Sequence, residues 1–141
     1  MPAILLIDDR RIENEVLHEI LAEAGHHVTC EAEPRSVTAL VTSQSFDLVI
    51  SDLSMSGQTG VEIVQNLHRF RPALPILVMT DSATIENAVV ALREGAFDCL
   101  KKPFLKDEFL LAVDRVLRNS KLARENIGLR EEIQRDKEAR S

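Results

Sequence analysis

The sequence predicts an α/β fold in which five parallel strands form one sheet with helices on both faces, a three-layer doubly wound arrangement. Two observations lead to this prediction. Short apolar runs alternate along the chain with segments whose apolar residues recur at helical spacing, and the connections between them are short. Alternation of this kind indicates consecutive βα units, which build a parallel sheet with right-handed crossovers.

The elements can be assigned in order. The run AILLI at residues 3–7 is expected as the first strand, and the helical pattern after it ends at Gly25. That pattern is formed by Ile12, Val16, Ile20 and Leu21. The remaining strands are expected over residues 27–30, 47–51, 75–79 and 97–101, and the remaining helices over residues 35–43, 60–69 and 84–94. An extended C-terminal helix is expected from Lys106.

The composition changes near residue 119. Residues 1–118 are therefore expected as one domain, and residues 119–141 as a linker helix. Of its last 21 residues, 11 are charged, so this segment cannot form a core. The residues Leu122, Asn126, Leu129 and Ile133 follow one another at spacings of four, three and four, which suits a short coiled coil. The alternative is a solvated helix end, and the sequence leaves both open.

Composition excludes several classes of protein. The chain has 141 residues and a formal net charge of −6, which argues against direct nucleic-acid binding by this segment. Cys30 and Cys99 lack the CxxC spacing of zinc or redox sites, as expected for a reduced cytoplasmic protein. The N-terminal apolar run is too short for a signal peptide or a membrane span.

Polar side chains stand where the predicted strands end. They are Asp8 and Asp9 after the first strand, Asp52 after the third, Thr80 after the fourth and Lys102 after the fifth. In an open α/β sheet the ligand crevice lies at these strand ends. Three carboxylates in one crevice repel one another unless cations offset their charge. Oxygen ligands with room for water suit Mg²⁺, and Lys102 adds a fixed positive charge.

Such a site suits phosphoryl transfer to a carboxylate. Asp52 is the candidate acceptor, and Asp8 and Asp9 would hold the metal. Lys102 would pair with Asp52 or with a phosphoryl oxygen, and the hydroxyl of Thr80 would bind the attached phosphoryl group. Each of these residues alone could equally be a helix cap or a turn residue. Their joint occurrence at four strand ends favours the functional interpretation.

Four stretches carry a resemblance to a known family. LLIDDRR, LVISDLSMSGQTGVE, ILVMT and GAFDCLKKPF closely resemble the motifs of the receiver domain of two-component response regulators, over roughly residues 3–118. The resemblance implies a flavodoxin-like fold with strand order 2-1-3-4-5 and phosphorylation of Asp52 by a sensor histidine kinase. It also implies that Asp8 and Asp9 are the acidic pair, that Thr80 and Lys102 act at the phosphoryl group, and that the backbone carbonyl of Ser54 completes the metal site.

The output is suggested by a narrower resemblance. GAFDCLKKPF and ENIGLREEI are most similar to receivers of nitrogen-regulation-type, sigma-54-dependent activators, in which a dimerising linker helix follows the receiver. This resemblance implies transcriptional regulation through an ATPase and DNA-binding portion that lies outside these residues. The alternative is a stand-alone receiver that acts as a protein-interaction adaptor or a phosphorelay intermediate.

Two positions in the expected switch region depart from the family pattern. Cys99 stands where an aromatic residue usually couples to the Thr80 position, which puts the familiar ring rotation in doubt. Asp81 follows Thr80 where a small residue is usual, and its charge should disfavour an anion at the mouth of the site.

Two other classes of protein fit the sequence less well. A haloacid-dehalogenase-like phosphatase has an acidic Asp two residues after its nucleophile, but Ser54 holds that position relative to Asp52. A flavin or nucleotide module is disfavoured because DDRR follows the first strand and no GxGxxG or Walker sequence occurs. The chain is therefore expected not to be an enzyme, beyond catalysing its own phosphorylation and dephosphorylation.

Overall fold

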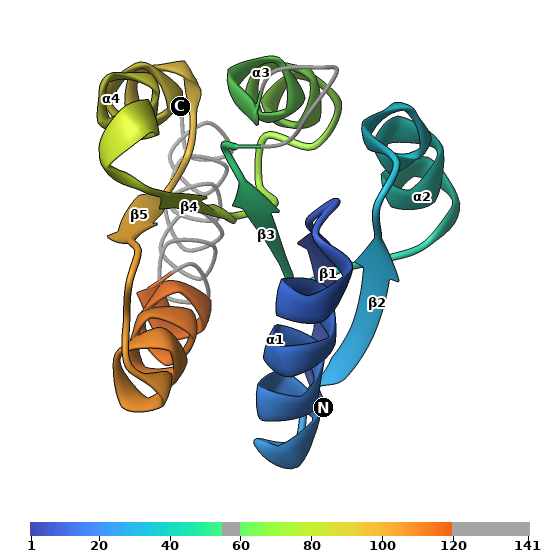
Figure 1. Ribbon diagram of the computed structural model, residues 1–141. Coiled ribbons are helices and arrows are strands. Elements are labelled where there is room, and N and C mark those ends of the chain that lie inside the picture. Colours follow the sequence, from blue (N-terminus) through green and yellow to red (C-terminus); the bar gives the residue numbers. More distant parts are fainter. Residues whose placement is uncertain (55–59, 120–141) are drawn as a thin grey trace, which may run out of the picture.

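The computed structural model describes residues 1–54 and 60–119, with Ser82 described by its backbone only. A single parallel sheet lies at its centre, in the order β2-β1-β3-β4-β5 (Figure 1). Its strands are β1 (Ala3–Ile7), β2 (His27–Glu31), β3 (Leu48–Asp52), β4 (Ile76–Thr80) and β5 (Asp98–Lys101). The predicted fold class and strand order are confirmed.

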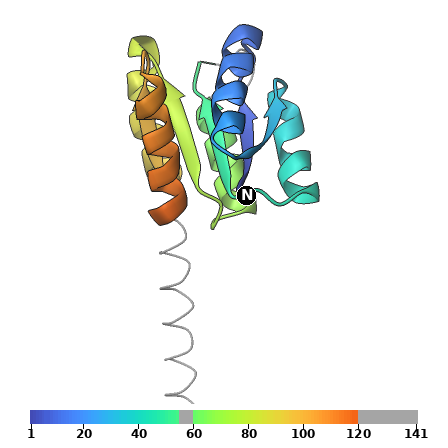
Figure 2. The same ribbon diagram turned by 90° about the horizontal axis from the view of Figure 1, so that it is seen from below.

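Helices cover both faces of this sheet (Figure 1). One face carries α2 (Val37–Ser43), α3 (Gly60–Phe70) and α4 (Ile85–Glu94), and the other carries α1 (Arg11–Glu23) and a helix over residues 106–119. Figure 2 shows α1 and the helix over residues 106–119 in front of the strands when the molecule is viewed from below. The central strands β1, β3 and β4 are mainly apolar and almost wholly buried, because both of their faces are covered.

Alternate residues of each strand pack into two separate hydrophobic cores, one on each face of the sheet. Leu5, Val49 and Val78 pack with α2, α3 and α4. Their neighbours in the strands face the other way and pack with Leu17 and Leu21 of α1 and with Phe109 and Val113 of the last helix. The residues concerned are Ile4, Leu6, Leu48, Ile50, Leu77 and Met79. Side chains alternate across a strand, so each short strand serves both layers.

The predicted boundaries need small corrections. Asp52 and Thr80 are the last residues of β3 and β4, not the first residues after them, because parallel pairing continues to Asp52 opposite Met79 and Thr80 opposite Lys101. The helix expected from residue 35 begins as a 3₁₀ turn, η1 (Pro34–Ser36), and becomes α-helical at Val37. Pro34 has no N–H to donate, which suits it to the first turn of a helix.

Two helices end at glycines, and the end of α1 agrees with the prediction from Gly25. Gly25 follows α1 with φ +93° and Gly95 caps α4 with φ +127°, a left-handed backbone region that L side chains rarely adopt. At Gly95 a side chain would also meet the ring of His68, since an added Cβ would lie 2.5 Å from His68 Cγ. Both glycines therefore turn the chain back towards the next strand.

The last helix begins at residue 106, as predicted. The boundary at residue 118 stays a prediction, and the expected linker helix or coiled coil lies outside the described residues from residue 120 onwards. In the described part of the chain, no helix has the length and apolar character needed to cross a membrane.

Candidate functional site

The carboxyl ends of the strands bring the predicted residues to one edge of the sheet. Backbone hydrogen bonds continue the pairing just past the strands and fix the residues there. Asp8 N–H donates to Glu31 O at 3.2 Å, Leu53 N–H to Met79 O at 2.9 Å, and Lys102 N–H to Thr80 O at 2.7 Å. The peptide bond between Lys102 and Pro103 is cis. The positions of the site residues therefore follow from sheet register.

Asp52 and Lys102 form a buried ion pair. Lys102 Nζ lies 2.6 Å from Asp52 Oδ2, and the two side chains are 14% and 1% exposed. The other oxygen, Oδ1, accepts a hydrogen bond from Ser54 N–H at 2.9 Å. A buried carboxylate needs such partners, because an unpaired charge is costly away from water. The sequence prediction that Asp52 and Lys102 come together is confirmed.

Glu13 was not predicted and belongs to the same cluster. Its Oε1 lies 2.5 Å from Lys102 Nζ, so the ammonium group bridges Glu13 on α1 and Asp52 on β3. Burial alone would lower the pKa of Lys102, but hydrogen bonds and charges from Asp52 and Glu13 outweigh it and raise that pKa. A sequence signal was available: Glu13, Leu17 and Leu21 lie four residues apart, and the two leucines are buried.

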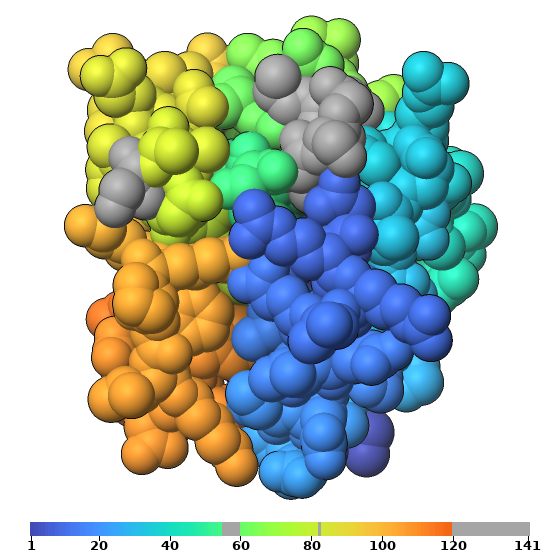
Figure 3. Space-filling view, in the orientation of Figure 1, coloured from blue at the N-terminus to red at the C-terminus, as the bar shows by residue number. Residues whose placement is uncertain are grey.

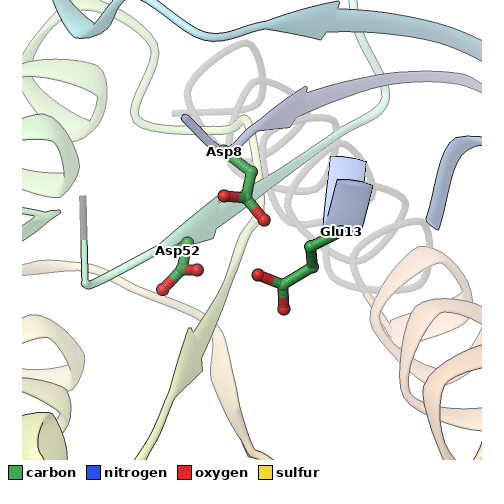
Figure 4. A group of neighbouring side chains, drawn as sticks. All are labelled: Asp8, Glu13 and Asp52. Atoms are coloured by element: carbon green, nitrogen blue, oxygen red, sulfur yellow. The ribbon is translucent and has the colours of Figure 1, made fainter. Parts of the chain in front are cut away.

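Three carboxylates converge at this edge (Figure 4). Asp8, Glu13 and Asp52 point towards one another from the end of β1, from α1 and from the end of β3. Each offers an oxygen within 4.8 Å of the other two. Among the described residues, Asp8 Oδ2 and Glu13 Oε2 are buried without a hydrogen-bond partner. Oxygens of this kind, with uncompensated charge, fit a hard divalent cation.

The electrostatics of Asp8 reflect this crowding. Burial raises the pKa of Asp8 to about 7, a hydrogen bond from Arg10 N–H opposes the rise, and the charges of Glu13 and Asp52 add to it. The ionised form is thus disfavoured when no cation is bound. A divalent cation would reverse that balance.

Asp9 and Ser54 lie outside the group of three converging carboxylates. Asp9 is half-buried, and its oxygens are not part of the group formed by Asp8, Glu13 and Asp52. Ser54 is placed next to Asp52 by its N–H bond, and its hydroxyl donates to Asp81 Oδ2 at 3.3 Å. The metal-binding roles of Asp9 and of the Ser54 carbonyl stay predictions.

The hydroxyl of Thr80 is held within residues 80–84. Thr80 is fully buried, and its Oγ1 lies 2.6 Å from Thr84 Oγ1 and 3.2 Å from the backbone oxygen of Asp81. Asp81 Oδ1 accepts hydrogen bonds from the N–H groups of Ala83 and Thr84 at the start of η2 (Ser82–Thr84). Thr84 is a partner that the sequence did not predict.

Asp81 acts as a cap in this structure. Burial alone would raise its pKa, but the hydrogen bonds from Ala83, Thr84 and Ser54 outweigh that effect and lower it. Its charge is therefore partly satisfied by the η2 turn and the Ser54 hydroxyl. The predicted repulsion of an anion by Asp81 stays a prediction.

Cys99 lies on β5 opposite Val78 and is half-buried against the core under α3 and α4. Burial raises the pKa of its thiol, and the charge of Asp98 adds to the rise. A thiol is too small to repeat the exchange of a large ring between buried and exposed positions. The expectation that the familiar ring rotation does not operate at this position stays a prediction.

A surface cavity of about 700 Å³ adjoins the site. Residues of α1 and residues that follow β5 line it, and these blue and orange segments meet in Figure 3. Val16 and Phe104 contribute apolar surface, and its polar members are Arg10, Glu13, Asp81, Lys102 and Lys106. The cavity lies next to Lys102, which pairs with Asp52 at this edge of the sheet.

Comparisons with known proteins agree with this geometry. Residues 4–114 match the family described as the response regulator receiver domain. The DNA-binding transcriptional regulator NtrC of Azospirillum brasilense is 34% identical over 117 residues, which cover 83% of this chain and 24% of the relative. The C4-dicarboxylate transport transcriptional regulatory protein DctD of Rhizobium meliloti (strain 1021) is 31% identical, with 92% of this chain and 28% of the relative covered.

Solved structures give the same result. NtrX from Brucella abortus in complex with ADP superposes with a TM-score of 0.86 at 31% identity, covering 91% of this chain and 30% of that one. A response regulator receiver domain protein from Clostridium thermocellum gives 0.82 at 26% identity and is covered over 99% of its length, with 87% of this chain. The chain spans about a quarter of the length of the curated relatives described here.

Proposed function

Because this chain belongs to the response regulator receiver family, whose members act in phosphorylation-based two-component signalling, we propose that Asp52 accepts a phosphoryl group from a sensor histidine kinase. The observation that carries the proposal is the position of Asp52. Its carboxylate is buried, bonded to Lys102 and Ser54, and placed beside the unpartnered oxygens of Asp8 and Glu13. These surroundings suit a carboxylate that reacts, since a structural ion pair would not require two further acidic groups beside it.

The proposed step is a transfer between two nucleophiles. An oxygen of Asp52 attacks phosphorus, the phosphorus–nitrogen bond to the kinase histidine breaks, and the imidazole leaves with the bonding electrons and takes up a proton. Lys102 can stay with Glu13 while donating to a phosphoryl oxygen, because an ammonium group has three protons. The hydroxyl of Thr80 would then leave Thr84 and donate to the attached phosphoryl group.

Receivers bind Mg²⁺ at an acidic pocket, and the carboxylates of this chain fit that ion. We assign the site to Asp8, Asp9, Asp52 and the backbone carbonyl of Ser54. When bound, the ion neutralises the negative charge that accumulates on the phosphoryl oxygens. We propose no other enzymatic activity, so that the chain turns over only its own phosphate.

The proposed output is transcriptional regulation in the cytoplasm. Relatives such as NtrC and DctD carry that function in their names. Residues 1–118 would be the receiver, and residues 119–141 a linker that associates two copies. The net charge of −6 argues that DNA contact belongs to another part of the regulator. The stand-alone adaptor or phosphorelay intermediate is the alternative, and the solution mass with and without beryllofluoride distinguishes a switched dimer from a constant monomer.

Phosphorylation can be tested directly on the full chain. Acetyl phosphate and MgCl₂ should add the mass of one phosphoryl group to the wild type, measured by intact mass spectrometry. Asp52→Asn should remain unmodified. Asp107→Asn, an exposed Asp on the last helix, is the matched control and should be modified like the wild type. Equal modification of Asp52→Asn would refute the assignment of the acceptor. Sustained turnover of a phosphatase substrate would indicate a phosphatase instead.

A further inference from the structure

Glu13 lies on α1 and shares Lys102 with Asp52, but only one of its oxygens takes part in that ion pair. Oε1 contacts Lys102 Nζ at 2.5 Å. Oε2 is buried and, among the described residues, has no hydrogen-bond partner; the guanidinium of Arg10 lies 3.9 Å away and is half-exposed. The second oxygen is thus available to a further partner inside the cluster.

A second oxygen in the same state lies beside it. Asp8 is fully buried, and its Oδ2 also lacks a hydrogen-bond partner among the described residues, while its Oδ1 accepts from Arg10 N–H. The carboxylates of Asp8, Glu13 and Asp52 all point into one space (Figure 4). Buried polar oxygens are nearly always bonded, and two such oxygens on carboxylates that converge suit a bound cation.

The charge of the cluster defines what that ligand must be. Three carboxylates face one ammonium, which leaves two negative charges in a largely buried group when all three are ionised. A monovalent cation would neutralise only one of these two negative charges, and a neutral ligand would neutralise neither. A divalent cation compensates it and takes oxygen ligands.

We propose that Glu13 is a direct ligand of the divalent cation through Oε2, so that α1 supplies a carboxylate to the metal site beside those of β1 and β3. This inference rests on the metal site of the proposed function and adds a residue to it. Glu13 is suited to the role because α1 fixes its direction: Leu17 and Leu21, one and two turns later on the same face, are buried in the core. Glu15, by contrast, is exposed and paired with Arg11.

A further carboxylate has a consequence for the ion. Mg²⁺ usually keeps several of its waters and uses one or two carboxylates, whereas larger ions accept more protein oxygens. With Glu13 bound, the ion would keep one water fewer than in a variant whose residue 13 has no side-chain oxygen. The site should therefore accept Mn²⁺ well, and Mn²⁺ is a suitable probe.

The test uses Mn²⁺ and the full chain of 141 residues. Electron paramagnetic resonance of free Mn²⁺ gives the Kd, and water proton relaxivity of the bound ion reports the number of coordinated waters. For Glu13→Gln we expect a Kd weakened about tenfold or more, the scale of losses seen when groups around a metal are removed. In Glu13→Ala, which has no side-chain oxygen, the relaxivity per bound ion should increase by the contribution of one more coordinated water. Glu15→Gln, on the same helix, should keep both values of the wild type.

The outcomes separate the possible failures. If Glu13→Gln and Glu13→Ala, which has no side-chain oxygen, both weaken the Kd without a change in relaxivity, Glu13 acts through charge or through Lys102 alone, and the inference is wrong. If Glu13→Gln keeps the wild-type Kd while Asp8→Asn and Asp52→Asn lose affinity, the metal site stands and Glu13 is not in it. If Asp8→Asn and Asp52→Asn also bind as the wild type does, the metal site of the proposed function fails. Urea unfolding of each variant checks that it is folded.

Discussion

The hydroxyl oxygens of Thr80 and Thr84 lie 2.6 Å apart, which ties the last residue of β4 to the start of α4. Thr80 is buried at the same edge of the sheet as Asp52. If Thr80 binds a phosphoryl group on Asp52, it must give up this contact. The contact therefore stabilises the unphosphorylated arrangement. Its loss would release the start of α4 from β4.

Thr84→Val should make that change easier. Valine keeps the shape of the side chain but cannot bond to Thr80, so the unphosphorylated arrangement loses a hydrogen bond worth about 1 kcal/mol. The affinity for beryllofluoride with Mg²⁺, measured by fluorine NMR titration, should increase by about fivefold, the factor for that energy. Thr42→Val, which removes an exposed hydroxyl bonded to Thr38 O, is the control. An unchanged or weaker affinity in Thr84→Val would contradict this role.

Lys102→Met should destabilise the metal-free protein. It leaves Asp52 and Glu13 without their shared cation, and breaking a buried ion pair costs about 3 kcal/mol or more. Urea unfolding in EDTA measures the loss. Mg²⁺ should recover part of it in the variant, because the ion replaces the missing positive charge.

Lys106→Met is the matched control for that experiment. Its ion pair with Glu23 is 3.5 Å long and exposed, and pairs of this kind contribute about 0–1 kcal/mol. Equal losses in the two lysine variants would mean that the ammonium of Lys102 is not essential to the cluster.

The pKa of Asp8 gives a pH prediction for the metal-free protein. The folded pKa is about 7 against an ordinary value of 3.8, so the folded state binds this proton more tightly than the unfolded state does. The contribution of Asp8 to stability is therefore greatest below pH 3.8 and falls as the pH rises towards and through about 7.

Asp8→Asn removes that titration. In EDTA its urea midpoint should exceed that of the wild type by more at about pH 8 than at about pH 5, because the contribution of Asp8 to wild-type stability falls throughout the range between its unfolded and folded pKa values. Mg²⁺ should raise the wild-type midpoint at the higher pH and raise that of the variant much less. The same difference between the two proteins at both pH values would show that Asp8 does not titrate in this range.

Much of the fold was predictable because the sheet is covered on both faces. Short continuous apolar runs such as ILVMT are typical of strands buried on both faces, and Gly95 marks the end of a helix. The one-residue shift at Asp52 and Thr80 arises because hydrogen-bond pairing, not polarity, decides where a strand ends. The backbone of the last residue of a strand can take part in sheet pairing while its polar side chain belongs to the site.

The site was predictable only where it lies on strands. Asp8, Asp52 and Lys102 follow from the rule that strand ends share one crevice. Glu13 and Thr84 come from helices, and their contacts depend on how α1 and α4 are packed against the sheet. The available signal was a charged residue, Glu13, on the buried face of α1. Recognising it would have required knowing where α1 lies relative to the strand ends.

The most direct test of the account is the location of the phosphate. After reaction with acetyl phosphate and MgCl₂, borohydride reduces an aspartyl phosphate to homoserine, and peptide mass spectrometry then locates the changed residue. We predict homoserine at position 52 alone, and none when EDTA replaces MgCl₂. Homoserine at another Asp, or none at position 52 with Mg²⁺ present, would contradict the central claim.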